Sequence, residues 1–447
     1  MSSKLALQGS TASTSASADS LYRKVAWHVM PLLVICYIAN FIDRTNIGIA
    51  QIQMRSDLGF SDGVYGIGVS LTFLGFILFE VPSNLFLARF GARKTLLRIM
   101  VAWGLVSTCT MFVSAPWQFY LLRFLLGAAE AGFFPGALLY LNYWFPSSRR
   151  SRMTGIFFLG IPLAGIIGSP LSGWIMHAFA GEKGLHGWQW LFVLEGVPSV
   201  VLGILTFLIL KDGPEKADWL SAAERDQIMT DLAAEQSLKT NTGHGSMLDA
   251  MRDPRVYVLG LIGACCYVLV VAVAFWSPLI IHASGVKDVL YVGLLGAIAP
   301  FVGVICMLVM GEHSDRTLER RWHTAFAWLV ASAALFGLSV TVGSPWIAVI
   351  LVTLMTAGHY CGLTVFWSIP AVYLDEKAKA AGIAMVTAMG STAGAITPAL
   401  FGWIRTVTGS LSLGLQLSAA MVLAGAVILL VAVPARVLRE KSSRQSL

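Results

Sequence analysis

The chain has 447 residues, of which 56% are hydrophobic and 12% are charged, and its formal net charge is +7. A soluble domain carries about twice that charged fraction, so the composition excludes an ordinary soluble protein and indicates a membrane protein. The positive charge does not indicate a nucleic-acid partner, because Lys and Arg stand in short clusters between apolar segments rather than along one polar face.

The N-terminal residues differ from the rest of the chain. Residues 1–20 are rich in Ser, Thr and Ala and hold no apolar core, which predicts a disordered tail rather than a signal peptide. Twelve apolar segments follow, each of about 20 residues and long enough to cross a hydrocarbon layer of roughly 30 Å as a helix. They are centred near residues 38, 76, 104, 130, 165, 199, 268, 299, 332, 358, 392 and 423. The expected fold class is therefore an all-α membrane protein with twelve transmembrane helices.

A polar interval from Lys211 to Arg255 separates six apolar segments from six. Within it, Ser221 and Glu224 have the spacing of a capping box, which predicts a short helix in a cytoplasmic connector. The expected organisation is a disordered tail, a six-helix bundle, the connector, a second six-helix bundle and a cytoplasmic tail. These cover residues 1–20, 21–210, 211–254, 255–435 and 436–447.

The basic residues between the apolar segments indicate the orientation in the membrane. If Met1 is cytoplasmic, eleven Lys and Arg residues of the connecting segments lie on that side and four on the other. Positive residues favour the cytoplasmic side, so we expect both termini in the cytoplasm.

The two halves resemble each other at an offset of about 230 residues. ARFGARK at 88–94 corresponds to DRTLERR at 315–321, and FFPGALLYL at 133–141 corresponds to FWSIPAVYL at 366–374. A repeat in the same orientation predicts two six-helix bundles related by an axis along the membrane normal, the arrangement of major facilitator transporters. A substrate site then lies between the bundles near the middle of the membrane.

Four charged residues of the first half lie inside apolar segments, where a charge costs about 2.5 to 3.5 kcal/mol. Asp43 and Arg44 are in the first segment, and Arg123 and Glu130 are in the fourth. Arginine stays protonated and binds a carboxylate through two hydrogen bonds, whereas a buried acid can take up and release a proton. The set predicts a binding site for an anion and protons. The alternative is a pair of structural ion pairs between the two helices.

Other charged residues of the membrane segments have more modest expected roles. Glu195, near the end of the sixth segment, is interpreted as structural. The loops at 88–94 and 315–321 resemble the loop between the second and third helices of each half in major facilitator transporters. In that loop glycine permits close helix approach and Asp–Arg pairs hold helix ends together, so we expect these residues to act as a conformational latch. The first loop has Ala88 where the acid is expected, and Glu80 is the candidate replacement. The residues assigned to the latch are Glu80, Arg89, Gly91, Arg93, Asp315, Arg316 and Arg320.

Several long motifs occur together and in order: FIDRTNIGIA, GFILFEVPSNLFLARFGARK, RFLLGAAEAGFFPGALLYLNYWFP and FWSIPAVYL. With them the chain resembles the anion:cation symporter family of the major facilitator superfamily over nearly its whole length. The resemblance implies a proton-coupled uptake system of a bacterial inner membrane, for organic anions such as tartrate, phthalate, galactonate or hydroxyphenylacetate. It also implies that Asp43 and Glu130 carry protons and that Arg44 and Arg123 bind the substrate anion.

Departures from the family pattern bear on the substrate. Phe41 and Phe76 stand where the family often has tyrosine, and Ser391 stands where an amide is common. A polyhydroxylated sugar acid would lack hydrogen-bond partners in such a site. The expected substrate is therefore a compact dicarboxylate of the tartrate type, or alternatively an aromatic carboxylate. Further residues expected to line the cavity are Trp367, Ser368, His359 and Tyr360.

Other classes of protein fit the sequence less well. An exchanger of organic anions remains an alternative, although the buried acids argue against it. An ATP-driven pump requires a G-x-x-x-x-G-K-[ST] loop, which is absent, and no hydrolase motif occurs, so the chain is not expected to be an enzyme. No cofactor or metal site is predicted, since the six cysteines are scattered without a CxxC pair. The expected partners are a small organic anion, protons and the lipid bilayer, with no nucleic acid, and the expected state is a monomer.

Overall fold

The computed structural model describes residues 2–239, 247–341 and 343–435, with the backbone alone for residues 2–18, 88, 236–239, 376–378 and 380. All regular structure in this part is helical, and twelve stretches are long and apolar enough to cross a membrane. Each of the twelve predicted segment centres falls within one of these stretches, which confirms the predicted fold class. The predicted C-terminal tail, 436–447, lies outside the described residues.

Six membrane spans form the first half of the chain. Three of them are single helices or nearly so, and three consist of two consecutive helices. They are α1 (Ser2–Thr45) with α2 (Ile47–Leu58), α3 (Asp62–Phe90), α4 (Ala92–Cys109) with the short 3-10 turn η1 (Thr110–Phe112), α5 (Pro116–Glu130) with α6 (Phe133–Asn142), α7 (Ser147–Phe158) with α8 (Gly160–Ala178), and, after the turn η2 (Glu182–Gly184), α9 (Gly187–Ile209).

The connector and the second half follow. The connector contains η3 (Pro214–Lys216), α10 (Ala222–Lys239) and α11 (Met247–Arg252). The six spans of the second half are α12 (Pro254–Val271) with the π-helical turn η4 (Ala272–Trp276) and α13 (Ser277–Ala283), α14 (Val289–Gly296) with α15 (Ile298–Thr317), α16 (Arg321–Val340), α17 (Pro345–Phe366) with α18 (Ser368–Tyr373), α19 (Glu376–Thr408) and α20 (Ser412–Ala432).

Two of the helix breaks in the first half lie beside charged residues. Asn46, a weak helix former, separates α1 from α2 two residues after Arg44. Gly132 separates α5 from α6 two residues after Glu130, and its φ of +89° is a left-handed conformation that favours glycine. A side chain at Gly132 would also collide with Ser83 of α3. Interrupted helices in the middle of a membrane are typical of transporter binding sites.

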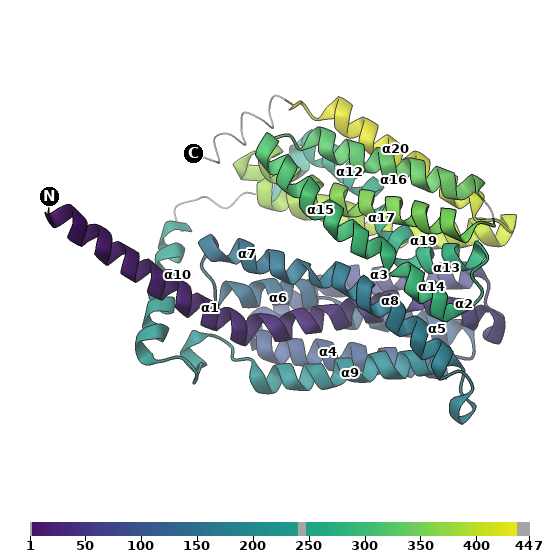
Figure 1. Ribbon diagram of the computed structural model, residues 1–447, viewed down its shortest axis with the longest axis horizontal. Helices are drawn as coiled ribbons and strands as arrows, with labels where there is room; N and C mark the ends of the chain where they lie inside the picture. Colours follow the sequence, from purple (N-terminus) through teal and green to yellow (C-terminus); the bar gives the residue numbers. More distant parts are fainter. Residues whose placement is uncertain (1, 240–246, 342, 436–447) are drawn as a thin grey trace.

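The two halves form separate bundles that converge at one end, as Figure 1 shows. We call this end the far end, because it lies away from the connector; the opposite end is the connector end. Glycines allow a close approach between the bundles. A Cβ atom added to Gly66 of α3 would lie 3.2 Å from the Cα of Gly402 of α19. A Cβ atom added to Gly173 of α8 would likewise lie 3.1 Å from the Cα of Gly293 of α14. Such small residues let membrane helices pack backbone to backbone.

Polar contacts between the halves also lie at the far end. Asp62, at the start of α3, binds Arg405 of α19 with an N–O distance of 2.7 Å and its own half's Arg55 at 3.1 Å. His177 of α8 lies 3.2 Å from Asp288, just before α14. Further hydrogen bonds between the two bundles join Gly63 to Thr406, Ser70 to Ala399, and both Gln51 and Tyr65 to the Phe275 carbonyl. The halves are therefore locked together at the far end.

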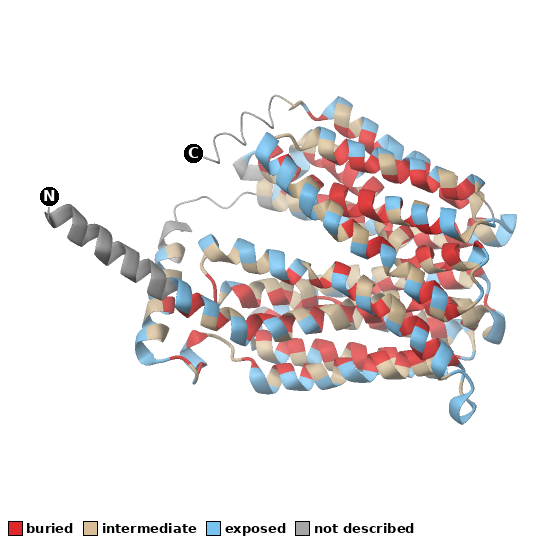
Figure 2. Cartoon of the chain, viewed as in Figure 1, coloured by how far each residue is buried: buried red, intermediate tan, exposed pale blue. Residues whose placement is uncertain are grey.

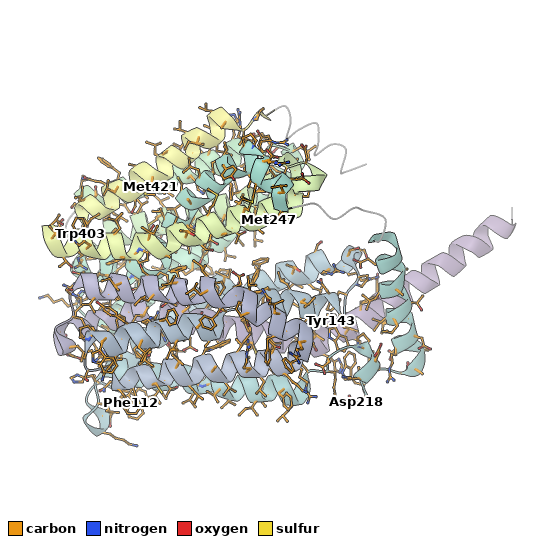
Figure 3. All side chains as sticks on the ribbon, turned by 180° about the vertical axis from the view of Figure 1, so that it is seen from behind. Phe112, Tyr143, Asp218, Met247, Trp403 and Met421 are labelled. Carbon is orange, nitrogen blue, oxygen red and sulfur yellow. The ribbon has the colours of Figure 1, made fainter. Side chains whose placement is uncertain are left out.

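Side chains follow the pattern expected of a protein in lipid. Buried residues concentrate where helices face each other, and exposed residues cover the outer surfaces of both bundles (Figure 2). Large apolar side chains are among those exposed; Trp403 and Met421 project from the second bundle in Figure 3. An outward apolar surface over all spans is what a bilayer requires.

Helix α10 of the connector is attached to the first half, whereas α11 packs against α19 of the second half. Ser221 and Glu224 form the predicted capping box, with N–O distances of 2.8 and 3.3 Å. Glu224 also accepts from Lys24 of α1 at 2.8 Å, Tyr22 donates to Asp231 at 2.7 Å, and Arg150 donates to Glu235 at 3.0 Å.

The N-terminus differs from the predicted disordered tail. The backbone of residues 2–20 is helical and continuous with the first span as part of α1. Once a helix exists, each added residue forms one more hydrogen bond, so extension from the first span is easier than nucleation.

Candidate functional site

Arg44 and Glu130 form an ion pair between the first and fourth membrane spans. Nε and Nη2 of Arg44 both donate to Oε2 of Glu130, at 2.8 and 2.6 Å. The Glu130 side chain is 0% exposed, whereas 24% of the Arg44 side chain is exposed. The pair therefore joins the two helix breaks, and its accessible part is the guanidinium.

Aromatic rings surround this guanidinium. Its carbon lies 5.5 Å from the ring centroid of Phe41 and 5.2 Å from that of Phe76, distances typical of a cation–π contact. Tyr267 of α12, in the second half, interacts with the same guanidinium electrostatically. Ser391 of α19 donates a weak hydrogen bond of 3.5 Å to the Tyr267 hydroxyl. Arg44 thus faces the second half across a lining of aromatic rings and neutral hydroxyls.

Arg123 is a second guanidinium, and it is buried. The residue is 1% exposed, and Nε, Nη1 and Nη2 have no hydrogen-bond partner among the described residues. Glu130, Asp43 and Tyr65 interact with it electrostatically. Because a guanidinium has five N–H donors and burying them unpaired is costly, an anion that reached Arg123 would find donors that no protein group occupies.

Asp43 lies on another side of α1, inside the first-half bundle. Trp103 and Ser107 of α4 donate to its carboxylate at 3.0 and 2.8 Å, and Ser199 of α9 donates at 2.6 Å. Asp43 is 0% exposed. The four predicted charges therefore do not share one accessible cleft, because successive helix residues point about 100° apart: Arg44 is accessible between the halves and Asp43 is enclosed.

Glu195 of α9 is a third buried carboxyl of the first half. Ser172 of α8 donates to Oε1 at 2.7 Å, and the Asn46 amide donates to Oε2 at 3.0 Å. These bonds tie α9 to α8 and to the break between α1 and α2, as a structural role requires.

The remaining predicted cavity residues come from α17 and α18. Trp367 and Ser368 are half-buried, and the Ser368 hydroxyl donates to the Val365 carbonyl at 2.6 Å. His359 and Tyr360 are buried, with ring centroids 5.6 Å apart, and Nδ1 of His359 has no partner among the described residues. These four residues add aromatic and neutral polar groups, and no permanent charge.

Tyr360 marks a contact between the halves. Its ring packs beside Gly303 of α15, where an added Cβ would lie 2.8 Å away. Its hydroxyl lies 4.0 Å from the position of a Cβ on Gly165 of α8, in the first half. The structure thus brings Tyr360 to the interface between the bundles.

The latch residues of the first half are arranged differently from the prediction. Glu80 makes no hydrogen bond or ion pair with any described residue, and it interacts electrostatically with Tyr267 across the interface. The acid beside the 88–94 loop is Asp212, which accepts from the Arg93 backbone N–H at 3.4 Å. No described residue of this loop forms a hydrogen bond with Glu80, and the role of Glu80 in the latch stays a prediction.

The other residues of this loop make local contacts. The Arg93 side chain donates to the Phe207 carbonyl, and the Arg89 guanidinium carbon lies 5.3 Å from the Phe90 ring centroid. Gly91 has a φ of +86° and permits the turn between α3 and α4.

The latch residues of the second half form ion pairs within their own half. Asp315 lies 3.4 Å from Arg320, and Arg316 pairs with Glu312 one helical turn earlier. The described residues of neither loop form a hydrogen bond with the opposite bundle, in agreement with halves that are joined at the far end. No group of His, Cys, Asp and Glu with metal-binding geometry occurs among the residues that the structure describes.

Comparison with known proteins identifies the family. Residues 33–398 match the family described as Major Facilitator Superfamily. The chain is 42% identical over 421 residues to a Pseudomonas putida protein named as a metabolite transport protein, NicT, covering 93% of this chain and 95% of that one. It is 41% identical over 411 residues to an Agrobacterium vitis protein named as a tartrate transporter, covering 92% and 94%. The chain belongs to the major facilitator superfamily.

Solved members of the superfamily share the fold. The partially occluded, inward-open structure of the xylose transporter XylE from Escherichia coli matches this transporter with a TM-score of 0.72 at 14% identity, over 91% of this chain and 98% of that one. The bacterial relatives and the twelve spans support an integral protein of the bacterial inner membrane. The relatives also confirm the resemblance to organic anion transporters and bear out a transporter of small organic substrates.

Sequence analysis missed four residues of the transporter's charged network: Trp103, Ser107, Ser199 and Tyr267. All four are neutral, and Ser, Trp and Tyr are ordinary residues of membrane helices, so composition does not single them out. The one available signal was spacing. Ser199 stands four residues after Glu195, so the two lie on the same face of a helix.

Proposed function

We propose that this transporter is a proton-coupled symporter that imports a small organic anion, with a compact dicarboxylate of the tartrate type as the first candidate. The observation that carries the proposal is the pairing of Arg44, accessible between the halves, with the fully buried Glu130. A substrate carboxylate and Glu130 compete for the same guanidinium. When Glu130 takes up a proton its charge is lost, and Arg44 becomes free to bind the substrate through two hydrogen bonds.

Arg123 supports a second point of attachment. It lies seven residues before Glu130, about 10 Å along the fourth span, and its donors have no protein partner. A compact dianion that binds Arg44 with one carboxylate could reach toward Arg123 with the other. Rearrangement of side chains near the helix break after Glu130 would allow Arg44 and Arg123 to bind the same substrate.

Import of an anion requires a driving force. The membrane potential, negative inside, opposes entry by about 2.3 kcal/mol per charge per 100 mV. Each proton that accompanies the substrate cancels one negative charge and adds the pH gradient. A dianion therefore requires at least two protons for electroneutral entry, and the buried acids Glu130 and Asp43 are the carriers that we assign.

The distribution of basic residues supports an orientation with the connector end in the cytoplasm. In that orientation the far end is periplasmic, and the state described above is closed on the periplasmic side. Import then requires that Asp62–Arg405 and His177–Asp288 separate, so that the bundles rock about the central site.

The test is uptake of radiolabelled tartrate into proteoliposomes with an acidic exterior. We expect accumulation that a protonophore abolishes, together with alkalinisation of the medium that starts on addition of tartrate. Accumulation that is insensitive to the protonophore, and is driven instead by anions loaded inside, would favour the exchanger.

A second candidate substrate is an aromatic carboxylate of the phthalate or hydroxyphenylacetate type. The rings of Phe41, Phe76 and Tyr267 around Arg44 favour it, since an aromatic body could pack on them while its carboxylate binds the guanidinium. Competition of phthalate and hydroxyphenylacetate against labelled tartrate, and direct uptake of each, distinguish the two candidates.

A further inference from the structure

Glu195 has surroundings that fit either protonation state. Its two hydrogen-bond partners are the Ser172 hydroxyl and the Asn46 amide, and neither is charged. A hydroxyl can donate to a carboxylate or accept from a carboxylic acid. An amide offers the same choice when it rotates by 180°, because its oxygen then replaces its nitrogen. No partner of Glu195 would be lost if this carboxyl were protonated.

Asn46 provides an independent indication. The residue is 2% exposed, and its Oδ1 has no hydrogen-bond donor among the described residues. A buried amide oxygen without a donor is unusual in native proteins. Rotation of the amide would place this oxygen against Oε2 of Glu195, where a protonated carboxyl would supply the donor.

The other two acids of the bundle each have a partner that can only donate. Glu130 accepts two hydrogen bonds from Arg44, a group that never loses its proton in proteins. Asp43 accepts from the Trp103 indole, which can only donate, so one of its two oxygens must remain an acceptor. Of the three acids, Glu195 alone has only partners that can either donate or accept a hydrogen bond.

Charge balance also favours a proton at this position. Asp62 is buried at the far end, where Arg55 and Arg405 compensate its charge. The interior of the first-half bundle contains three further buried carboxyls, Asp43, Glu130 and Glu195, and two guanidinium groups, on Arg44 and Arg123. With all five ionised, one negative charge remains uncompensated in the membrane interior, which is costly. One proton removes the excess, and Glu195 can accept it without losing a hydrogen bond.

Glu195 is close to Asp43 through one serine. Ser199, one turn after Glu195 on α9, donates to Asp43 at 2.6 Å. Asp43 and Glu195 interact electrostatically. The groups that meet Glu195 from the other helices are neutral: Ser172 from α8, Asn46 from the end of α1, and Thr108 of α4 against Gly196. The ionisation of one of the two acids therefore opposes the ionisation of the other.

We propose that Glu195 is a third proton-binding carboxyl of this transporter, which takes up and releases a proton in alternation with Asp43 on the side of the bundle away from Arg44. The inference rests on the proposed proton coupling and extends it. The chemistry is one reversible step: a proton from water forms an O–H bond with a carboxylate oxygen of Glu195, and the charge of this group changes from −1 to zero.

The first test needs no substrate. Infrared difference spectra of the purified, full-length transporter between pH 5 and pH 9 record the carboxyl groups that change protonation. We expect Glu195→Gln to lose one component of the protonated-carboxyl band that the wild type shows. Glu195→Asp should retain a component, and Glu182→Gln, an exposed acid of the far-end loop, should leave the spectrum unchanged. A Glu195→Gln spectrum identical to that of the wild type would overturn the proposal.

A matched variant separates proton binding from a purely structural role. Ser172→Ala removes one partner of Glu195 and keeps the carboxyl, so the component should move to a different pH midpoint without disappearing. Thermal unfolding of each variant in detergent reports folding separately. If Glu195→Gln unfolds at a lower temperature but retains the full carboxyl band, Glu195 is structural and the proposal fails.

The second test is the ratio of protons to tartrate in proteoliposomes. We expect Glu195→Gln to carry one proton fewer per tartrate than the wild type, so that accumulation at a pH difference of one unit falls about tenfold. An unchanged ratio would contradict the proposal. If the wild type moves no protons with tartrate while Glu195→Gln still loses its infrared component, the proposed symport of tartrate fails and the proton site at Glu195 stands.

Discussion

Asp43 and Arg44 are adjacent in the chain but belong to different parts of the bundle: Arg44 binds Glu130 at the surface facing the second half, and Asp43 accepts three hydrogen bonds from α4 and α9 inside the first half. The two charges therefore act on different partners. A proton on Asp43 changes the interior of the first half, whereas a proton on Glu130 frees Arg44. In the proposed mechanism, Glu130 therefore acts beside the substrate-binding guanidinium, and Asp43 acts inside the first half.

Replacement of Arg44 by lysine should weaken substrate binding. Lysine keeps the charge but lacks the planar pair of donors that grips a carboxylate. Loss of one charge-assisted hydrogen bond, about 1.5–3 kcal/mol, predicts a KM for the transported anion that is roughly 10- to 100-fold higher. Initial rates of uptake measure it, and Arg152→Lys, at an exposed position of α7, is the control. A KM unchanged in Arg44→Lys would remove Arg44 from the substrate site.

Two replacements of Asp43 should distinguish the effect of its charge from the effect of its hydrogen bonds. In Asp43→Asn the amide oxygen can accept from Trp103 and Ser199 while the amide nitrogen donates to Ser107, whose hydroxyl is able to accept. We expect this variant to fold with nearly normal stability, to exchange substrate across the membrane, and to lose proton-driven accumulation.

The contrast is Asp43→Leu, which removes every acceptor and leaves the Trp103 indole N–H buried and unpaired. An unfolding free energy lower by about 1–3 kcal/mol is expected, visible as a lower melting temperature in detergent. Trp103→Phe in the Asp43→Leu background should recover part of the loss, since it removes the unpaired donor. Normal proton-driven accumulation by Asp43→Asn would show that Asp43 does not carry a coupling proton.

The ion pair between Asp62 and Arg405 should hold the far end closed. Arg405→Gln removes the charge that joins α19 to α3, while Arg405→Lys keeps it. Ser70 of α3 accepts a hydrogen bond from the Ala399 backbone of α19, at another contact between the halves. In a Ser70→Cys background we expect a membrane-impermeant thiol reagent to label Arg405→Gln several-fold faster than Arg405→Lys. Faster labelling would mean that a larger fraction of the molecules is open at the far end. Equal labelling of both variants would mean that this ion pair does not control opening.

The hydroxyl of Tyr267 should distinguish the two candidate substrates. Tyr267→Phe keeps the ring beside Arg44 and removes the hydroxyl that Ser391 contacts. A tartrate-type acid, which has hydroxyls to satisfy, should lose affinity by about 0.5–1.5 kcal/mol, whereas phthalate should bind equally well. Competition curves for both acids measure the difference, and Tyr257→Phe, at an exposed position of α12, is the control. A larger loss for phthalate than for tartrate would contradict this assignment of the hydroxyl.

The fold was largely predictable because its determinants are local. A run of about 20 apolar residues fixes a membrane helix regardless of its neighbours, and the intramembrane position of Asp43, Arg44, Arg123 and Glu130 is visible in the sequence itself. The repeat of ARFGARK and DRTLERR likewise depends on the sequence alone.

The partners of these residues were not predictable in the same way. Which of Asp43 and Arg44 faces the second half depends on the rotation of α1, and packing against α4, α8 and α9 sets that rotation. Asp212, which contacts the first latch loop, is more than 100 residues away from it in the chain. Tyr267 reaches Arg44 from the other half. Contacts of this kind require the tertiary arrangement, which hydrophobic periodicity does not contain.

The most direct test of the account is simultaneous measurement of proton and tartrate movement in proteoliposomes that contain either the wild type or Glu130→Gln. The wild type should take up protons together with tartrate and accumulate tartrate against its gradient when the exterior is acidic. Glu130→Gln, in which Arg44 has no anionic partner, should still exchange labelled for unlabelled tartrate but should take up fewer protons per tartrate and accumulate little. Equal proton-to-tartrate ratios in the two proteins would contradict the central claim that Glu130 couples proton binding to the release of Arg44.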